Sequence, residues 1–557
     1  MKKNETTSLK SLILRFKGAI FILLFILFVF TGSVLSQVAQ QWVARYNGTG
    51  NGLDDAYSIA LDGSGNVYVT GRSYGSGTSY DYCTIKYNSS GVQQWVARYN
   101  GTGDSDDVAS SIAVDGSGNV YVTGGSYGSG TSFDYCTIKY NSSGVQQWVA
   151  RYNGPGNYDD EAFSIALDGS GNVYVTGYSY GNGTIYDYCT IKYNSSGVQQ
   201  WVARYNGPGN DYDYAISIAL DGSGNAYVTG TSVGSGTGDD YCTIKYNSLG
   251  VQQWLARYNG PGNGSDEAYS IKVDSTGNVY VTGGSTGGGT GFDYCTIKYN
   301  SSGVQQWVAR YNGPGNEEAT SIALDGSGNV YVTGRSDGIG TDRDYCTIKY
   351  NSSGVQQWVA RYNGPGNWDD KANSIVVDGS GNVYVTGYSD GGGTNWDYCT
   401  IKYNSSGVQQ WIARYNGPGN SLDKARSIAV DGSGNVYVTG SSTGSGTYDD
   451  YCTIKYSQGV GIKKISTEIP SLFSLSQNYP NPFNPNTRIR FDLPKNVNVK
   501  LTIYNMLGRE IETIVNEQLN AGSYEVTFDG TKYTSGVYYY RLNASEFVET
   551  KKMILVK

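Results

Sequence analysis

A unit of about fifty residues is repeated along the chain, and this repetition limits the possible folds more than any other feature. Each copy reads QQWVARYNG, SIALDGSGNVYVTG, DYCTIKYN and SSG, in that order and with small changes. A repeat of this length means that each copy is one supersecondary unit packed against its neighbours. The spacing is 53 residues, except for one step of 51 in which two residues are missing after Asn316, and the repeated tryptophans are Trp42, Trp95, Trp148, Trp201, Trp254, Trp307, Trp358 and Trp411.

The segments within one unit have the composition of strands and turns. They are short, rich in β-branched and aromatic residues, and separated by Gly, Asn, Asp and Ser. Asp62–Asn66 is expected to form a tight hairpin, and Asn88–Gly91 a second turn. In the first unit we expect strands at Gln41–Asn47, Ser58–Leu61, Asn66–Thr70 and Tyr82–Tyr87.

Four strands per unit and a period near fifty residues are typical of propeller blades. The chain begins with a lone QQWVARYNG segment at Gln40–Gly48, and the last unit stops at Tyr456 without that segment. Pairing of the first strand with the last unit would close a ring and leave no exposed sheet edge, whereas an open β-solenoid would not need this offset. The sequence therefore predicts an all-β chain with an eight-bladed β-propeller over residues 37–457, closed by an N-terminal strand.

The repeat resembles a family of bacterial propeller repeats known as SBBP. The matching pieces are Ser58–Asp62, Gly65–Gly71 and Asp81–Lys86, and they recur in each unit. The resemblance implies a secreted β-propeller and is nearly silent on activity. The family name implies seven blades, whereas this sequence contains eight units, each with its own Trp and Cys.

Residues 1–36 are typical of a secretory signal peptide. Basic residues precede an unbroken apolar run at Ala19–Phe30, and Val34-Leu35-Ser36 offers a cleavage site before Gln37. As a helix the twelve apolar residues would rise about 18 Å, which is too short for a bilayer core of about 30 Å. We therefore expect no membrane span in the mature chain.

The C-terminal part has a different composition and is expected to be a second domain. Residues 458–472 form a linker, and residues 473–557 contain alternating segments typical of a small Ig-like β-sandwich. Five strands are expected, at Arg488–Leu493, Val499–Asn505, Gly522–Phe528, Val537–Leu542 and Glu549–Val556.

This tail resembles the type A C-terminal sorting domain of type IX secretion. The matching pieces are Tyr479–Pro485, Ile503–Arg509, Ser535–Leu542 and Lys551–Lys557. The resemblance implies a Gram-negative source, export to the cell surface or medium, and the type IX secretion machinery as partner. The residues that carry it are Tyr479, Pro480, Asn481, Pro482, Gly508, Gly536, Lys551 and Lys557.

Comparison of the eight units predicts one constant and one varied face. The turns Asp-Gly-Ser-Gly-Asn and Asn-Ser-Ser-Gly barely change, and alternate connections of a blade lie on the same face. The other two connections vary and carry Tyr, Trp and Asp, residue types that suit glycan or protein ligands. The alternative is drift in unconstrained loops. The candidate binding residues are Tyr158, Tyr180, Tyr212, Trp368 and Trp396.

A carboxylate recurs two residues before the alanine of the inner strand. Closure would bring these groups around one mouth of the ring, where they could bind a hard cation such as calcium. Alternatively, each caps a turn by accepting backbone N–H bonds, which recurrence in every blade favours. The Asp-Gly-Ser-Gly-Asn turn lacks the further acidic ligands of a calcium loop and is expected to be a plain hairpin. The recurring carboxylates are Asp54, Asp107, Asp160, Asp213, Asp266, Glu317, Asp370 and Asp423.

The chain also has one cysteine per unit. Neighbouring copies in the third strand would lie about 12 Å or more apart, beyond the Cα separation of about 7 Å that a disulfide allows. We therefore expect buried free thiols, at Cys83, Cys136, Cys189, Cys242, Cys295, Cys346, Cys399 and Cys452.

Composition limits the possible functions. The chain has no histidine, which excludes Ser-His-Asp and Cys-His catalytic units and His-ligated metals, and its net charge of −8 argues against nucleic-acid binding. The preferred function is a non-enzymatic binding or adhesion scaffold at the cell surface, without a cofactor. The alternatives are a structural matrix component and a glycan-acting enzyme that uses paired carboxylates such as Asp159/Asp160 or Asp369/Asp370.

Overall fold

A computed structural model of the chain describes residues 38–458, 463–466, 468–530 and 533–557. The described residues divide into two compact units, one within Gln37–Gly461 and one within Ile462–Lys557. The expected signal peptide lies outside the described residues. Within the described ranges, no helix has the length and apolar character needed to cross a bilayer.

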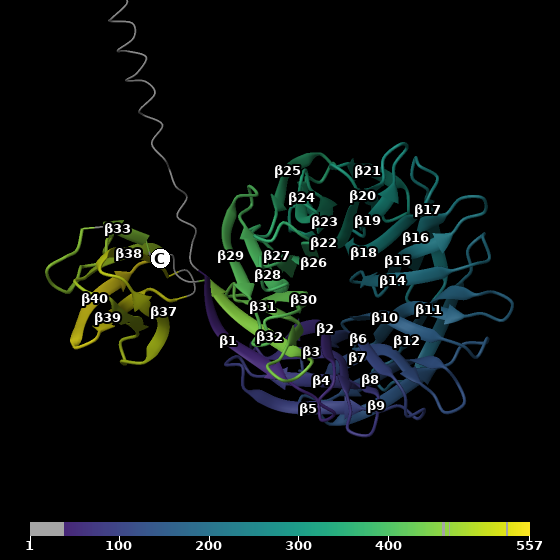
Figure 1. The fold of residues 1–557 in the computed structure, drawn as a ribbon, viewed down its shortest axis with the longest axis horizontal. Coiled ribbons are helices and arrows are strands. Elements are labelled where there is room, and N and C mark those ends of the chain that lie inside the picture. The colour runs from purple at the N-terminus through teal and green to yellow at the C-terminus, as the bar shows by residue number, and fades with distance from the viewer. Residues whose placement is uncertain (1–37, 459–462, 467, 531–532) are drawn as a thin grey trace, which may run out of the picture. The chain divides into compact units, whose positions relative to one another are not determined.

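The first unit is a ring of eight four-stranded antiparallel sheets (Figure 1). Seven sheets each use four strands consecutive in sequence, and the eighth combines the first strand with the last three. In chain order the strands are β1 (Val38–Tyr46); β2–β5 (Asp54–Leu61, Val67–Tyr74, Tyr80–Tyr87, Gln93–Tyr99); β6–β9 (Asp107–Val114, Val120–Tyr127, Phe133–Tyr140, Gln146–Tyr152); β10–β13 (Asp160–Leu167, Val173–Tyr180, Tyr186–Tyr193, Gln199–Tyr205); β14–β17 (Asp213–Leu220, Ala226–Val233, Asp239–Tyr246, Gln252–Tyr258); β18–β21 (Asp266–Val273, Val279–Thr286, Phe292–Tyr299, Gln305–Tyr311); β22–β25 (Glu317–Leu324, Val330–Asp337, Arg343–Tyr350, Gln356–Tyr362); β26–β29 (Lys371–Val377, Val383–Asp390, Trp396–Tyr403, Gln409–Tyr415); and β30–β32 (Asp423–Val430, Val436–Thr443, Asp449–Gln458).

The two middle strands of each sheet are buried on both faces. In β3 the five residues Val67–Gly71 are all buried, and β4 repeats this pattern from Asp81 to Ile85. A strand covered on one face would alternate buried and exposed residues. Since neighbouring sheets cover both faces, the Val-Tyr-Val-Thr and Tyr-Cys-Thr-Ile runs need no polar side.

Most junctions between neighbouring sheets share the same few hydrogen bonds, although Trp411 Nε1 at the last junction has no partner among the described residues. The Tyr82 hydroxyl donates to the carbonyl of Cys136 in the next sheet, at 3.0 Å. Lys86 Nζ and Trp95 Nε1 both donate to the carbonyl of Ser142 in the next sheet, each at 3.2 Å. The recurring Trp, Lys and Tyr thus link each unit to the next one.

The first strand closes the ring, as the sequence predicts. β1 pairs antiparallel with β32, from Val38 opposite Gln458 to Tyr46 opposite Tyr451. Trp42 Nε1 and Lys455 Nζ donate to the Ser89 carbonyl at 3.2 Å each, as the equivalent residues do at other junctions. In Figure 1, β1 lies beside β32 at the seam.

Strand positions follow the expectation, but several strands are longer. β2 begins at Asp54 rather than at Ser58, and β3 runs to Tyr74 rather than Thr70. These added stretches include positions that vary between units, such as Asp55, Arg72 and Tyr74, which interrupt the repeated strand pattern.

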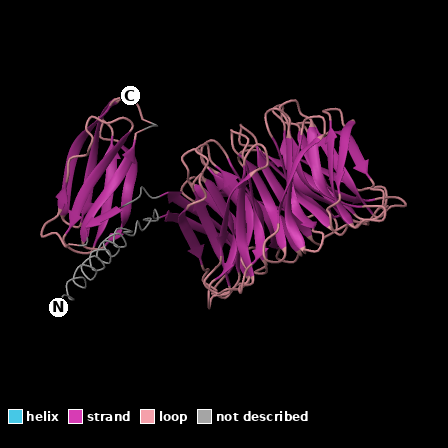
Figure 2. Cartoon of the chain, turned by 90° about the horizontal axis from the view of Figure 1, so that it is seen from above, coloured by secondary structure: helices cyan, strands magenta, loops and turns pink. Residues whose placement is uncertain are grey.

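The second unit consists of two four-stranded sheets, with strand orders β33-β38-β35-β34 and β37-β36-β39-β40 (Figure 2). In β35 every second residue is buried, the pattern of a sheet with one packed face. The strands are β33 (Lys463–Ser466), β34 (Ser474–Leu475), β35 (Asn486–Leu493), β36 (Val497–Tyr504), β37 (Glu510–Leu519), β38 (Gly522–Asp529), β39 (Gly536–Ala544) and β40 (Phe547–Leu555).

Two predictions for this unit were wrong. The segment 458–472 is not only a linker, because Lys463–Ser466 forms β33 and pairs with β38. The strand β37 was missed because it lies at a sheet edge and carries polar residues such as Glu510 and Glu512, which weaken a strand pattern.

The motifs at the two ends of this unit lie side by side. The Asn481 side chain accepts a hydrogen bond from the Ile554 N–H at 3.0 Å, and the N–H of Phe483 donates to the Ile554 carbonyl at 2.9 Å. Tyr479 is 72% exposed beside this contact. Of the other residues that carry the resemblance, Pro480 and Pro482 flank Asn481, Gly508 lies in the turn between β36 and β37, Gly536 begins β39, and Lys551 and Lys557 lie in and after β40.

The eight cysteines are free and buried, as predicted. Burial raises the pKa of the Cys83 thiol to about 12, so that little reactive thiolate forms near neutral pH. We expect the native chain to react with no more than a trace of a thiol reagent over an hour, and to expose eight reactive thiols after denaturation without reductant. Rapid labelling of the native chain, or fewer than eight thiols after denaturation, would contradict this arrangement.

Candidate functional site

The constant face is built of turns whose polar groups are already engaged. Asp62 Oδ1 accepts the N–H groups of Ser64 and Asn66, and Asp62 Oδ2 accepts the Asn66 amide and the Tyr68 hydroxyl. At Gly91, where φ is +80°, a Cβ atom would come 2.5 Å from the Trp42 ring. These turns therefore have a structural role that explains why they barely change.

The recurring carboxylates cap turns on the varied face, which consists of the loops equivalent to 47–53 and 75–79. Asp54 is fully buried, with Oδ2 accepting the Gly48 N–H at 2.7 Å and Oδ1 accepting the Tyr74 N–H at 3.1 Å. Within the described ranges, no three acidic or other ligand groups lie close enough to hold a metal ion. The equivalent residues are also fully buried and each accepts at least one loop N–H, but the second oxygen of Asp107, Asp213, Glu317 and Asp423 has no hydrogen-bond partner among the described residues; they are Asp107, Asp160, Asp213, Asp266, Glu317, Asp370 and Asp423.

A row of varied side chains crosses the end of each sheet next to these loops. In the first sheet, Asp55 of β2 lies opposite Arg72 of β3, and their side chains form an ion pair at 2.9 Å. The Arg72 guanidinium lies 4.4 Å from the centre of the Tyr80 ring, and the Tyr57 hydroxyl contacts Asp55 at 3.4 Å. We call the positions equivalent to Asp55, Tyr57, Arg72 and Tyr80 the row of a unit. The residues in the row differ from unit to unit, while the strands around them stay nearly the same.

The rows and loops of the third and fourth units form a cluster of aromatic rings. Ring centres are 4.7 Å apart for Tyr158 and Tyr180, 5.5 Å for Tyr180 and Tyr186, and 5.7 Å for Tyr186 and Tyr212. Tyr158 and Tyr212 are 61% and 44% exposed. The structure thus brings together three of the predicted residues. It adds Phe163, Tyr178, Tyr186 and Tyr214, which the sequence analysis did not select.

Charge is distributed unevenly around the ring. Arg72 is the one basic residue in the rows of the first five units, whereas the last three rows contain Arg335, Arg343, Lys371, Lys424 and Arg426. These cations also join neighbouring rows. Lys371 pairs with Glu318 at 3.2 Å, and Lys424 lies 4.5 Å above the Trp396 ring. Near-identical units therefore carry an asymmetric set of side chains.

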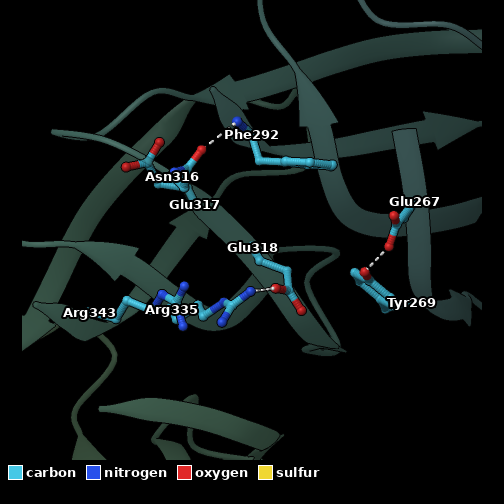
Figure 3. Close-up of a pocket in the computed structure, with 8 residues that line it drawn as sticks. All are labelled: Glu267, Tyr269, Phe292, Asn316, Glu317, Glu318, Arg335 and Arg343. Atoms are coloured by element: carbon cyan, nitrogen blue, oxygen red, sulfur yellow. Dashed lines mark hydrogen bonds and ion pairs between the residues drawn. The ribbon is translucent and has the colours of Figure 1, made fainter. Parts of the chain in front are cut away.

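A cavity of about 340 Å³ opens where the fifth and sixth units meet (Figure 3). Arg335 and Glu318 form an ion pair on one side of it, and the Tyr269 hydroxyl bonds to Glu267 on the other. The cavity is lined by Glu267, Tyr269, Phe292, Asn316, Glu317, Glu318, Arg335 and Arg343.

This cavity coincides with the irregular step of the repeat. Two residues that other units place before the recurring carboxylate are missing after Asn316, so the loop is shorter here. The longer side chain of Glu317 compensates, since its Oε1 accepts the Gly315 N–H at 3.1 Å. Its Oε2 is buried and has no hydrogen-bond partner among the described residues, and burial raises the pKa of Glu317.

The two predicted tryptophans lie apart from the tyrosine cluster. Trp368 and Trp396 line a second cavity, of about 230 Å³, which lies over the seventh unit between Asp342 of the sixth and Leu422 of the eighth. The rows were not predicted, because the variation between units is most visible in the loops. The signal was present, since Asp55, Tyr57, Arg72 and Tyr80 occupy the few variable positions inside otherwise constant strands.

The comparison with protein families agrees with both units. A beta-propeller repeat family, SBBP, matches residues 41–77, 94–130, 147–183, 200–236, 306–340, 357–393 and 410–446. A secretion system C-terminal sorting domain matches residues 477–557. The chain is an SBBP-repeat protein with a type IX sorting domain.

The seven SBBP matches leave out the fifth unit, whose strands β18–β21 nevertheless form the same sheet as the others. That unit departs from the pattern at Lys272 and at the turn Asp274–Asn278. The sorting domain directs this SBBP-repeat protein to the surface of a Gram-negative cell or to the medium, and implies contact with the secretion machinery.

Other similarities are distant. An uncharacterized WD repeat-containing protein of Acanthamoeba polyphaga mimivirus is 24% identical over 447 residues, which cover 64% of this chain and 31% of that protein. The chain thus spans about a third of that relative. PorZ of Porphyromonas gingivalis, a surface component of the type IX secretion system, is 16% identical with a TM-score of 0.40 and coverage of 94% and 69%. A fungal alcohol oxidase with copper is 14% identical with a TM-score of 0.38 and coverage of 80% and 96%.

Proposed function

We propose that this exported propeller is a binding or adhesion scaffold that holds a ligand on its varied face and carries out no reaction. One observation supports this most strongly. The differences between eight nearly identical units are concentrated at one end of the sheets, in adjoining loops and rows. Drift would also have altered the Asp-Gly-Ser-Gly-Asn and Asn-Ser-Ser-Gly turns of the other face.

The chemistry of the varied face also favours binding. The tyrosine cluster offers exposed rings with fixed orientation, which contribute contact area at low entropic cost. Most of the recurring carboxylates accept loop N–H groups, so we expect binding to need no calcium. Of the paired carboxylates considered for catalysis, Asp159 and Asp160 both make hydrogen bonds that serve the fold. Asp160 accepts the Gly154 N–H, and Asp159 accepts a hydrogen bond from the Ser132 hydroxyl.

The test is a binding screen of the full chain against oligosaccharides and extracted surface polymers, run with calcium and with a chelator. A double variant, Tyr158→Ala with Tyr212→Ala, and a single variant, Trp368→Ala, alter the varied face. The control is Val92→Ala with Val145→Ala, which changes side chains that are each 58% exposed on the constant face. We expect specific ligands that at least one varied-face variant loses and the control retains. Equal binding by all variants, or turnover of a bound glycan, would contradict the proposal.

A further inference from the structure

The cavity lined by Trp368 and Trp396 lies where one hydrogen bond found at the first two junctions is absent. At the first two junctions, the hydroxyls of Ser79 and Ser132 donate to Oδ1 of Asp106 and Asp159 in the next unit. These aspartates lie directly before the recurring carboxylates. These two junctions therefore show how a serine at this position satisfies the aspartate of the next unit.

At the sixth junction the donor is missing. Asp342 occupies the position of Ser79, and Asp369 occupies that of Asp106. The Asp369 Oδ1 atom is buried and has no hydrogen-bond partner in the described part of the chain. A buried carboxylate oxygen without a donor is unfavourable, and a hydroxyl group in the cavity would restore the bond that serine makes elsewhere.

An exposed indole lies beside this oxygen. Trp368 is 66% exposed, and no ring or cation is stacked on it among the described residues. Trp396 is held in place by the Tyr388 ring, with centres 4.8 Å apart, and by Lys424. The cavity thus combines a free aromatic surface with a fixed one.

The remaining polar groups of the cavity are mainly hydrogen-bond acceptors. They are the carboxylates of Asp342, Asp369 and Asp390, with the Asn395 amide as a mixed group. Their charge is partly balanced, since Arg343 lies 3.6 Å from Asp369 and Lys424 lies over Trp396. The cavity therefore favours a ligand with several hydroxyl donors and an apolar face over a ligand with net positive charge.

We propose that this cavity binds one neutral sugar ring of an oligosaccharide or polysaccharide. The apolar face of the ring stacks on Trp368, and its hydroxyls donate to Asp369 and Asp342. The volume of about 230 Å³ is below the range of about 300–1,000 Å³ typical for drug-sized ligands, in keeping with a single ring. This inference rests on the proposed binding function and names its ligand class and location.

The test measures affinity of the full chain for neutral, acidic and amine-bearing oligosaccharides by calorimetry after an array screen. We expect a neutral sugar to bind, with an affinity that changes less than about twofold between about 0.05 and 0.5 M salt, because no ion pair is formed. Trp368→Ala is expected to weaken it by about tenfold or more. Since this side chain is exposed, the variant should keep the melting temperature of the parent chain.

Asp342→Ser provides the sharper variant, because it restores the serine found at the first two junctions. The new serine hydroxyl would donate a hydrogen bond to Asp369 Oδ1 in place of the sugar. The affinity for the neutral sugar should therefore fall, while the melting temperature stays the same or rises. Val92→Ala, which changes a side chain 58% exposed on the constant face, is the control outside the cavity and should bind as the parent does. If the double variant of Tyr158 and Tyr212 loses the ligand but Trp368→Ala still binds it, the sugar site is wrong and the proposed function stands. A chain that binds amines alone, in a salt-sensitive way, would overturn this ligand class, and a chain that binds nothing would overturn both proposals.

Discussion

Deletion of residues 38–46 is expected to destabilise the propeller more than any point substitution. The deletion removes β1, which pairs with β32 along its whole length, and leaves the last sheet with three strands. At about 1 kcal/mol for each lost hydrogen bond, the loss of stability is on the order of 5–10 kcal/mol. The exposed edge of β32 should also promote association. Denaturant unfolding and light scattering would measure the two effects.

A peptide of residues 38–46 added in excess should partly restore the unfolding midpoint, whereas a scrambled peptide should not. Arg45→Ala and Arg204→Ala form a matched pair of milder variants. Arg45 bonds Asp450 at 2.9 Å across the seam, and Arg204 bonds Asp187 at 2.8 Å inside the third sheet. Similar decreases in the free energy of unfolding for both variants would mean that the pairing of β1 with β32 is as stable as the strand pairing within the other sheets. An unchanged midpoint after the deletion would show that the ring does not depend on β1.

The second large effect is a stability maximum on the acidic side of neutrality. Burial raises the pKa of Asp107, Asp160 and Asp370 to about 6 from an ordinary value of 3.8. The folded chain then binds more protons than the unfolded chain, so these groups stabilise it below about pH 4 and lose that contribution as the pH rises through about 6. Glu317 and Asp54 shift in the same direction, also mainly through burial.

The constant-face aspartates act in the opposite direction and at lower pH. Burial alone would raise the pKa of Asp62, but hydrogen bonds from Asn66, Tyr68 and Ser64 outweigh it and lower the pKa below 3.8. Stability from these groups is present above about pH 4 and falls below it. The melting temperature should therefore peak near pH 5. Asp107→Asn should reduce the gain on acidification, and a peak at pH 7 or above would contradict these pKa directions.

The fold was largely predictable because identical units need identical contacts. One Trp, one Cys and two Asp- or Asn-led turns per unit were enough to predict the ring and its closing strand. The strand β37 was not recognised because an edge strand tolerates Glu510 and Glu512, and β33 was hidden in a short segment beside unfavourable linker residues.

The candidate site was only partly predictable. Tyr158, Trp368 and Trp396 stand out in loops by residue type alone. Arg72 and Asp55 do not, since their contact depends on the register of β2 against β3, which a bulge between Ala56 and Ser58 shifts. The unpaired Asp369 oxygen could be recognised only from the structure, by comparison with the serine contacts of the first two junctions.

The sequence of the outer strands gives the closing step an ambiguity that the rest of the fold lacks. The closing strand has the sequence QQWVARY from Gln40, and the same sequence occurs in β5, β9, β13, β21 and β25. Side-chain contacts alone therefore do not determine which of these copies pairs with the edge of β32. The correct partner is also remote, since Arg45 and Asp450 are 405 residues apart. The choice of β1 as the partner of β32 therefore depends on how the copies are connected. Every other copy is joined to its own sheet by a short connection, which gives it a far higher effective concentration there than at β32. At high protein concentration, the unpaired β1 of a second molecule can pair with β32 in the same way. We therefore expect exchange of β1 between chains to be the characteristic misfolding event of this propeller.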